Sequence, residues 1–255
     1  MQKTTVLLAL FLLMLGKSSF SQKTDSTKTT SHFSGSIGIT DNGISLIPTF
    51  SLNKPAIVFD LSIGKKKLSF EPEFSFSYDS KPWNFLFWWR YKLVHTKKFF
   101  MNLGAHPAFA FQTIPVISNG VSKNVLVPQR YFALELTPNY FPGKNVSVGI
   151  YYLYSRGLDN NSINITHFLT LNSTVSGIPL GNQLSFRFTP QFYYLKLDTQ
   201  DGFYFTSSFT VDKKEFPLSV SAIINKTIKT DIVGSKNFVW NVSVIYSFNQ
   251  TYVKH

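Results

Sequence analysis

The residues best suited to chemistry are ionisable side chains that recur on the polar side of alternating segments. When such segments pair through tight turns, their same-side residues come within reach across neighbouring strands. Asp60 can then lie opposite Glu71, and Glu71 or Glu73 opposite Arg90, inside an enclosed space. The predicted charge cluster comprises Asp60, Glu71, Glu73, Arg90 and Lys92, extended by Glu135 and Arg187 from later segments.

Two interpretations of this charge cluster are open. The charges can form a constriction that selects the solutes crossing a narrow pore. Alternatively, they can form an internal network of ion pairs that keeps a small closed sheet shut, because buried carboxylates need cationic partners. His106, beside Gly104, is predicted to face the same interior, where it could pair with a carboxylate. A structural role for this histidine is favoured over general-base catalysis.

A catalytic site is not indicated by the spacing of nucleophiles and bases. His167 is predicted to face outward, but position 169 is Leu, and no serine follows on that face until Ser173. A nucleophile must lie within hydrogen-bond reach of its base, so a Ser/His hydrolase is disfavoured. The sequence also lacks a glycine-rich phosphate loop, zinc-ligand spacing and a calcium loop. We therefore expect no catalytic residue, no metal and no cofactor.

The elements that must position the charge cluster are strands with two opposite faces, best seen from Lys67 to Val94. Bulky residues alternate there with polar ones, which is the period of an extended chain. The apolar side is unusually aromatic and continues for about ten residues, the length that crosses a bilayer when tilted. We therefore expect this side to face lipid and the polar side to face an enclosed lumen. The aromatic side carries Leu68, Phe70, Phe74, Phe76, Trp83, Phe85, Phe87, Trp89 and Tyr91.

The same alternation predicts about twelve strands in one all-β antiparallel, up-and-down transmembrane barrel. The longest connections, 113–127 and 227–235, emerge on the same side, whereas the opposite side has tight turns. Prolines lie inside four of the segments and suggest local kinks or bulges. The expected strands are 44–52, 55–64, 67–79, 83–95, 97–112, 128–141, 144–156, 162–176, 181–197, 202–212, 215–226 and 236–249.

Composition and the chain ends agree with an exported membrane protein. Charged residues make up only 15% of the chain and aromatic residues 16%, whereas about 25% charge is usual in soluble domains. Residues 1–21 have the basic start, short apolar run and small-residue end of a cleaved signal peptide. Residues 22–43 are expected to be a periplasmic lead-in or a short N-terminal strand from 33 to 40, 44–249 the barrel, and 250–255 a tail.

Charge and cysteine content exclude several other classes. The net charge is +12, but the cations gather in turns rather than along one groove, so nucleic acid is not an expected partner. These turns can contact phosphorylated headgroups or simply be solvated. The chain has no cysteine, which excludes disulfides, thiol catalysis and attachment of lipid to an N-terminal cysteine.

The segments GISLIPTFSLNKPA, SFEPEFSFSY and KPWNFLFWWRYKL resemble those of a group of Gram-negative outer-membrane β-barrel proteins without assigned activity. The final strand, with aromatic residues that end at Phe248, resembles the signal read by the barrel-insertion machinery. Seven residues follow this phenylalanine, so the aromatic residue is not strictly C-terminal. The resemblance implies the cell outer membrane as location, and membrane lipids, lipopolysaccharide and the insertion machinery as partners.

The first functional hypothesis is a narrow channel or passive envelope protein for small solutes. A lipid-modifying outer-membrane enzyme is one alternative, and a soluble exported β-barrel that binds an apolar ligand, with its faces inverted, is another. About twelve strands leave room for a narrow channel but not for the water column of larger porins. Whether the lumen is open, and which solute crosses it, stays undecided, because it could be filled by Trp88, Phe100, Tyr151 and Tyr193.

Overall fold

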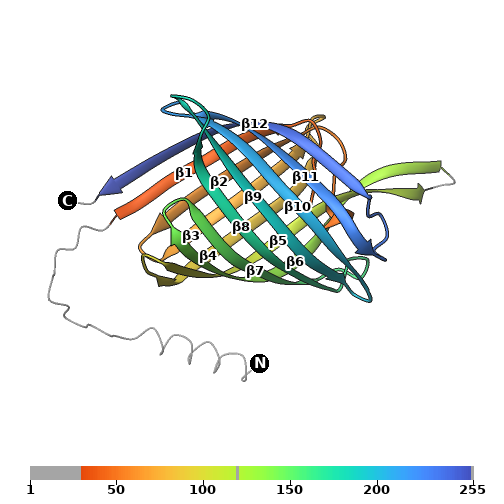
Figure 1. The fold of residues 1–255 in the computed structure, drawn as a ribbon. Helices are drawn as coiled ribbons and strands as arrows, with labels where there is room; N and C mark the ends of the chain where they lie inside the picture. The colour runs from red at the N-terminus through yellow and green to blue at the C-terminus, as the bar shows by residue number, and fades with distance from the viewer. Residues whose placement is uncertain (1–29, 119–120, 254–255) are drawn as a thin grey trace, which may run out of the picture.

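The computed structural model describes residues 30–118 and 121–253, and these residues form a single closed barrel (Figure 1). The expected signal peptide lies outside the described residues. Each strand pairs antiparallel with its neighbours in sequence, and the first strand pairs with the last. Among the described residues, no helix combines the length and apolar character needed to cross a bilayer. The strands are β1 Thr30–Thr40, β2 Ala56–Lys65, β3 Leu68–Ser77, β4 Pro82–His95, β5 Phe99–Ser118, β6 Val121–Gly143, β7 Val146–Gly157, β8 Ile165–Pro179, β9 Leu184–Leu197, β10 Gln200–Lys213, β11 Leu218–Thr230 and β12 Phe238–Val253.

The predicted number of strands is confirmed, but the first strand is not the expected one. β1 is formed by Thr30–Thr40, the segment for which a short strand from 33 to 40 had been left open. The predicted strand 44–52 is wrong, because that segment is a loop containing a 3-10 turn at Pro48–Phe50. The alternation in β1 is weak because Gly35 takes the place of an outward side chain. A Cβ at Gly35 would lie 2.9 Å from the ring of Phe248 in β12, so the seam requires a glycine there.

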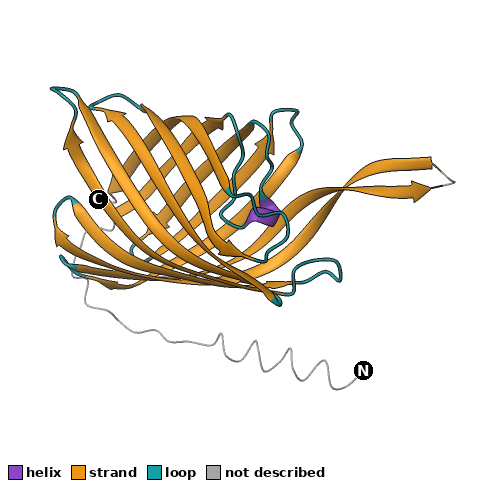
Figure 2. Cartoon of the chain, turned by 45° about the vertical axis from the view of Figure 1, so that its right-hand side comes forward, coloured by secondary structure: helices purple, strands orange, loops and turns teal. Residues whose placement is uncertain are grey.

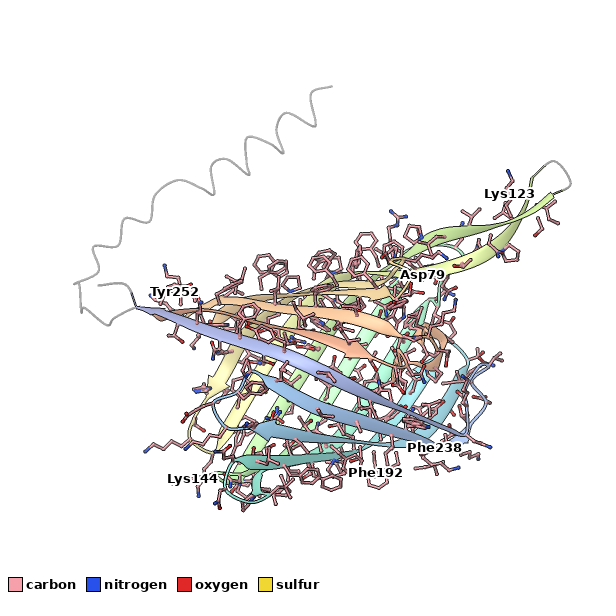
Figure 3. The ribbon with its side chains drawn as sticks, turned by 90° about the horizontal axis from the view of Figure 1, so that it is seen from above. Asp79, Lys123, Lys144, Phe192, Phe238 and Tyr252 are labelled. Carbon is pink, nitrogen blue, oxygen red and sulfur yellow. The ribbon has the colours of Figure 1, made fainter. Side chains whose placement is uncertain are left out.

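The two faces of the strands are distributed as predicted. Large side chains such as Trp89, Phe192 and Trp240 are 50%, 57% and 54% exposed on the outside of the barrel, where Figure 3 shows Phe192 and Phe238 pointing away from the interior. Small polar residues such as Thr206, 2% exposed, are buried. An apolar outer surface of this extent suits lipid rather than water. This distribution of side chains contradicts the alternative of a soluble barrel with its apolar side facing inward.

The four prolines that the sequence analysis placed inside strands do not produce the predicted bulges. Each one coincides instead with a gap of two residue pairs in one ladder, after which the register continues unchanged. In the β4–β5 ladder, for example, the pairs Leu86↔Ala108 and Trp89↔Ala105 flank the gap at Pro107. Proline lacks the backbone N–H that the ladder needs, so pairing stops locally without a slip. The other gaps contain Pro72, Pro138 and Pro190.

The two ends of the barrel differ in the length of their connections. Both termini of the barrel and its tight turns, such as residues 66–67 and 144–145, lie at one end. At the other end β5 and β6 continue past the barrel as a projecting ribbon (Figure 1). Residues 113–127, predicted to be a loop, are therefore mostly strand. Because short turns are periplasmic in such barrels, the ribbon end is the extracellular one. β12 runs to Val253, so the predicted tail begins later than residue 250.

Candidate functional site

The lumen is occupied at its extracellular end by residues 41–55, which we call the plug loop (Figure 2). This loop joins β1 to β2 and turns into the barrel. Leu46 and Ile47 pack on a buried cluster that includes Phe168 and Tyr193, while Phe50 packs on the cluster containing Tyr131. Leu46, Ile47 and Phe50, whose alternation with polar residues predicted a strand, therefore pack inside the barrel instead of facing lipid.

Polar contacts hold the plug loop against the barrel wall. Trp83 donates from Nε1 to the carbonyl oxygen of Phe50 at 2.7 Å, and the Phe50 ring lies edge-on to Tyr131 with centroids 5.3 Å apart. On the far side, Asn241 donates to the carbonyl oxygen of Asn42 at 3.0 Å. We call the Trp83–Phe50 contact the latch.

The latch depends on a β-bulge that alternation could not predict. Ser75 pairs with Asn84 and Phe76 pairs with Pro82, so Trp83 is the extra residue of the bulge. A bulge turns one side chain away from the face that strict alternation assigns to it. Trp83 was predicted to face lipid; instead it is 8% exposed and contacts the plug loop.

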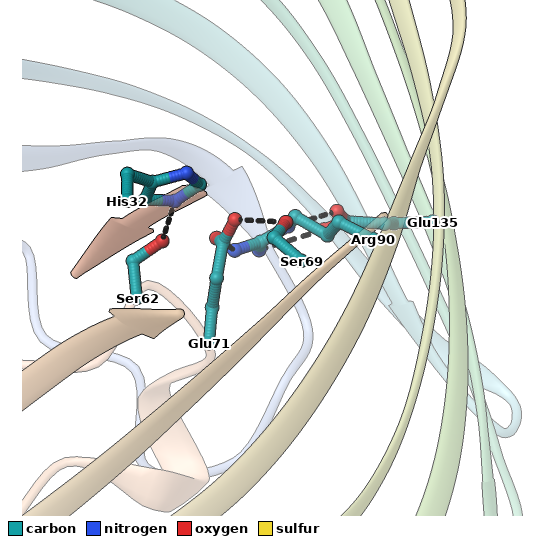
Figure 4. A network of polar contacts seen from close by, with 6 residues as sticks. All are labelled: His32, Ser62, Ser69, Glu71, Arg90 and Glu135. Atoms are coloured by element: carbon teal, nitrogen blue, oxygen red, sulfur yellow. Dashed lines mark hydrogen bonds and ion pairs between the residues drawn. The ribbon is translucent and has the colours of Figure 1, made fainter. Parts of the chain in front are cut away.

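Three of the seven residues of the charge cluster form an ion-paired bridge, which we call the cross-bar (Figure 4). Arg90 bonds Glu71 through Nη1, and its Nε lies 2.5 Å from Oε1 of Glu135. The Glu135 side chain is fully buried, with 0% exposed. Glu135 can reach Arg90 because Gly104, on the strand between them, has no side chain. The cross-bar thus joins β3, β4 and β6 across the lumenal face of β5.

The other predicted members of the charge cluster are arranged differently. Asp60 lies opposite Glu73, not opposite Glu71 as predicted, so two carboxylates are neighbours. Asp60 accepts a hydrogen bond from Ser36 at 3.0 Å and Glu73 accepts one from Ser75 at 3.0 Å.

The cationic members also differ from the prediction. Arg90 lies opposite Ser69 in the register and reaches Glu71 diagonally. Lys92 follows Arg90 on the same face of β4, nearer the periplasmic end. Arg187 is separate from the cluster, because it lies on β9 and pairs with Asp212 of β10 at 3.3 Å.

His106 faces the lumen, as predicted, but it does not pair with a carboxylate among the described residues. Its ring stacks on Trp88 with centroids 3.7 Å apart and planes 22° apart. The guanidinium of Arg90 lies 4.5 Å from the Trp88 ring centroid, which is cation–π geometry. A column of Arg90, Trp88 and His106 therefore lines one wall of the lumen beside the cross-bar.

Three hollows follow one another along the lumen. The outer hollow, about 400 Å³, lies between the plug loop and the β3–β4 and β5–β6 hairpins. The middle one, about 660 Å³, lies beneath the latch and shares Phe50 and Trp83 with the outer hollow. The inner one, about 320 Å³, shares Glu73 and Arg90 with the middle hollow. The latch thus lies where the outer and middle hollows meet, and Arg90 of the cross-bar lies where the middle and inner hollows meet.

The outer hollow carries a fixed charge near the extracellular surface. Asp79, in the β3–β4 turn, lies beside Lys81 at 2.7 Å and accepts a hydrogen bond from Ser77. Contacts first with Lys81 and then with Ser77 lower the pKa of Asp79 to about 2. Asp79 is therefore ionised throughout the physiological range, and it is accompanied by its own cation.

Sequence reasoning missed one polar pair in the lumen, formed by His32 and Ser62. His32 of β1 lies 2.9 Å from Oγ of Ser62 in β2, near the periplasmic end (Figure 4). His167 bonds the hydroxyl of Tyr152 at 2.8 Å, and Ser173 donates to the backbone of β7. A Ser/His pair on the outer wall, as the enzyme alternative would need, is therefore not formed by these residues. No group of three potential ligands for a metal occurs within 30–118 and 121–253.

The cross-bar can be tested by adding one methyl group at Gly104. A Cβ there would lie 2.6 Å from Cγ and Oε1 of Glu135, so Gly104→Ala should push Glu135 away from Arg90. We expect a loss of about 1–3 kcal/mol in the free energy of unfolding, typical of overpacking, measured by urea unfolding in detergent. Gly38→Ala is the control, because its nearest atom would be 3.7 Å away. Equal stability of the two variants would contradict the proposed role of Gly104.

Comparison with known proteins identifies the fold but no sequence family. No family model and no curated protein matches the chain. An outer-membrane channel from Pseudomonas putida F1 superposes with a TM-score of 0.50 at 10% identity, covering 91% of this chain and 100% of that one. The KdgM porin in complex with disordered oligogalacturonate gives a TM-score of 0.48 at 10% identity, covering 85% and 99%, and the NanC porin 0.47 at 12%, covering 88% and 100%. The closed barrel with its apolar outer belt, supported by the likeness to the Pseudomonas channel, identifies this chain as an outer-membrane β-barrel protein.

Proposed function

We propose that the protein is a narrow passive channel for small solutes. The observation that carries the proposal is the series of three hollows along the lumen, from the extracellular vestibule to the inner side of the cross-bar. A barrel whose only task is mechanical could fill this space with side chains, as barrels of about eight strands do. Here the space is left open in sections that are separated by two thin constrictions.

The two constrictions have different chemistry and therefore different roles in the proposal. The latch is one hydrogen bond from the Trp83 ring to the backbone of Phe50, a residue of a loop that is not part of the barrel wall and whose ring packs edge-on to Tyr131. The cross-bar is ionic and is built on three strands of the wall. The latch thus acts as the gate, while the cross-bar is the fixed charged filter.

Planar-bilayer recording on the purified, refolded protein tests the proposal. We expect discrete current steps that are small beside those of porins with about 16–18 strands. Heat-modifiable migration on a denaturing gel establishes that the inserted protein is folded. If folded protein gives no steps above the detergent control, and removal of the plug loop gives none either, the lumen is closed and the ion-pair network merely fills it.

A further inference from the structure

The middle hollow has the walls of a binding site for a small molecule. Its volume of about 660 Å³ lies within the range of about 300–1,000 Å³ for ligand pockets. Most of its wall is apolar, and much of it aromatic, from five different strands and the plug loop. The aromatic lining comprises Phe50, Trp83, Trp88, Phe109, Tyr131, Tyr151 and Phe168.

Two buried polar atoms on this wall have no hydrogen-bond partner among the described residues. They are Nδ1 of His106, a residue 4% exposed, and Oγ1 of Thr170, a residue 2% exposed. Both residues line the middle hollow. Buried polar groups in folded proteins are nearly always paired. Both atoms can accept a hydrogen bond, so an occupant of the middle hollow that carries N–H groups could satisfy them.

Carboxyl groups outnumber cationic groups at the inner end of the hollow, where Asp60, Glu71 and Glu73 surround Arg90. Glu73 lines it and forms none of the ion pairs of the described residues, since its carboxylate only accepts a hydrogen bond from Ser75. Arg90 cannot neutralise Glu73 fully, because it already pairs with Glu71 and Glu135. Asp60, opposite Glu73, adds a further carboxylate on the inner side. A bound cation would balance charge that the protein leaves unbalanced.

We propose that the middle hollow binds small organic cations that have a flat apolar body and an ammonium group. The ammonium group would lie toward Glu73, and the flat body would contact the rings of Tyr131 and Phe168. Aromatic faces also attract cations directly. The inference rests on the proposed function in one respect, namely that the bound cation would be a solute crossing the channel. Binding itself does not require conduction.

Calorimetry on the folded protein in detergent tests the inference with three probes that share one ring system. The probes are 2-naphthylmethylammonium, the neutral 2-naphthylmethanol and the anionic 2-naphthoate, each corrected for its heat of transfer into empty micelles. We expect the cation to bind about tenfold more tightly than the alcohol, a difference of about 1.4 kcal/mol, and the anion to bind least. Equal binding of cation and alcohol, or no binding of any probe, would overturn the inference.

Substitutions of the carboxylates separate the contribution of charge to probe binding from the contribution of the apolar wall. Glu73→Gln should abolish the preference for the cation while the alcohol binds as before, and Asp60→Asn should weaken the preference in part. Glu215→Gln is the control, because Glu215 is an exposed residue of the β10–β11 turn. If Glu73→Gln fails to fold, Asp60→Asn still decides, since an unchanged preference there and in the control would refute the electrostatic role.

Binding and conduction can fail separately. Probe binding without current steps would refute the channel and keep the site. Current steps without probe binding would refute the site and keep the channel.

Discussion

Replacing the plug loop, residues 41–55, with the dipeptide Asn-Gly should raise the single-channel conductance several-fold. Thr40 and Ala56 are register partners, so the two strands can be joined by the two-residue turn that hairpins favour. The replacement removes Leu46, Ile47 and Phe50 from the lumen and joins the outer and middle hollows. Planar-bilayer recording compares the variant with the unaltered protein.

A trimmed ribbon provides the control for this experiment. Ile114 and Val125 are register partners in the projecting part of β5 and β6, so residues 115–124 can also be replaced by Asn-Gly. This change lies outside the barrel (Figure 1) and should leave the conductance unaltered. Conductance that is equal in the plug-loop variant and the unaltered protein would show that the plug loop is no obstruction. Trp83→Phe, which removes only the donor of the latch, should give openings that are more frequent but no larger.

Arg90→Met should cause the largest loss of stability of any single substitution in the lumen. The variant leaves Glu135, whose side chain is 0% exposed, without a cation. Breaking a buried ion pair by removing one partner costs about 3–5 kcal/mol, because the remaining charge is buried and unpaired. Urea unfolding in detergent, followed by tryptophan fluorescence and gel migration, measures the free energy of unfolding.

Arg187→Met is the matched control for Arg90→Met. Arg187 also forms a lumenal ion pair, but with one carboxylate, Asp212, and its side chain is 51% exposed. Exposed pairs contribute only about 0–1 kcal/mol. In the triple variant Arg90→Met, Glu71→Gln, Glu135→Gln, most of the lost stability should return, since neither former partner of Arg90 then carries a charge. If Arg90→Met and Arg187→Met unfold at the same urea concentration, the cross-bar does not stabilise the barrel.

The barrel, its lipid face and its strand number could be predicted because side-chain alternation is a local property. Each strand needs an apolar side of about ten residues whatever its neighbours are. The first strand was misplaced where that rule fails. Gly35 leaves room for the ring of Phe248, a residue from the far end of the chain. Leu46 and Ile47 pack on an apolar cluster inside the barrel instead of facing lipid. Both causes are tertiary and have no local signal.

The composition of the charge cluster could be predicted, but its pairing could not. A register error of two residues keeps every side chain on its proper face and still changes its partner, which is why Asp60 was assigned to Glu71 instead of Glu73. The contact of Glu135 with Arg90 spans an intervening strand and depends on Gly104. Trp83 was misassigned because a single extra residue in the β3–β4 ladder reverses the local alternation.

The plug loop differs from a free plug domain in that both of its ends are fixed to the same rim of the barrel wall. Thr40 and Ala56 are held in adjacent ladders there, so the segment cannot travel down the pore and leave on the periplasmic side. The plug loop can leave the lumen only by rotating outward about its two anchored ends, Thr40 and Ala56. A molecule that holds the plug loop in its outward position would therefore have to bind it from the extracellular side and not from the periplasm.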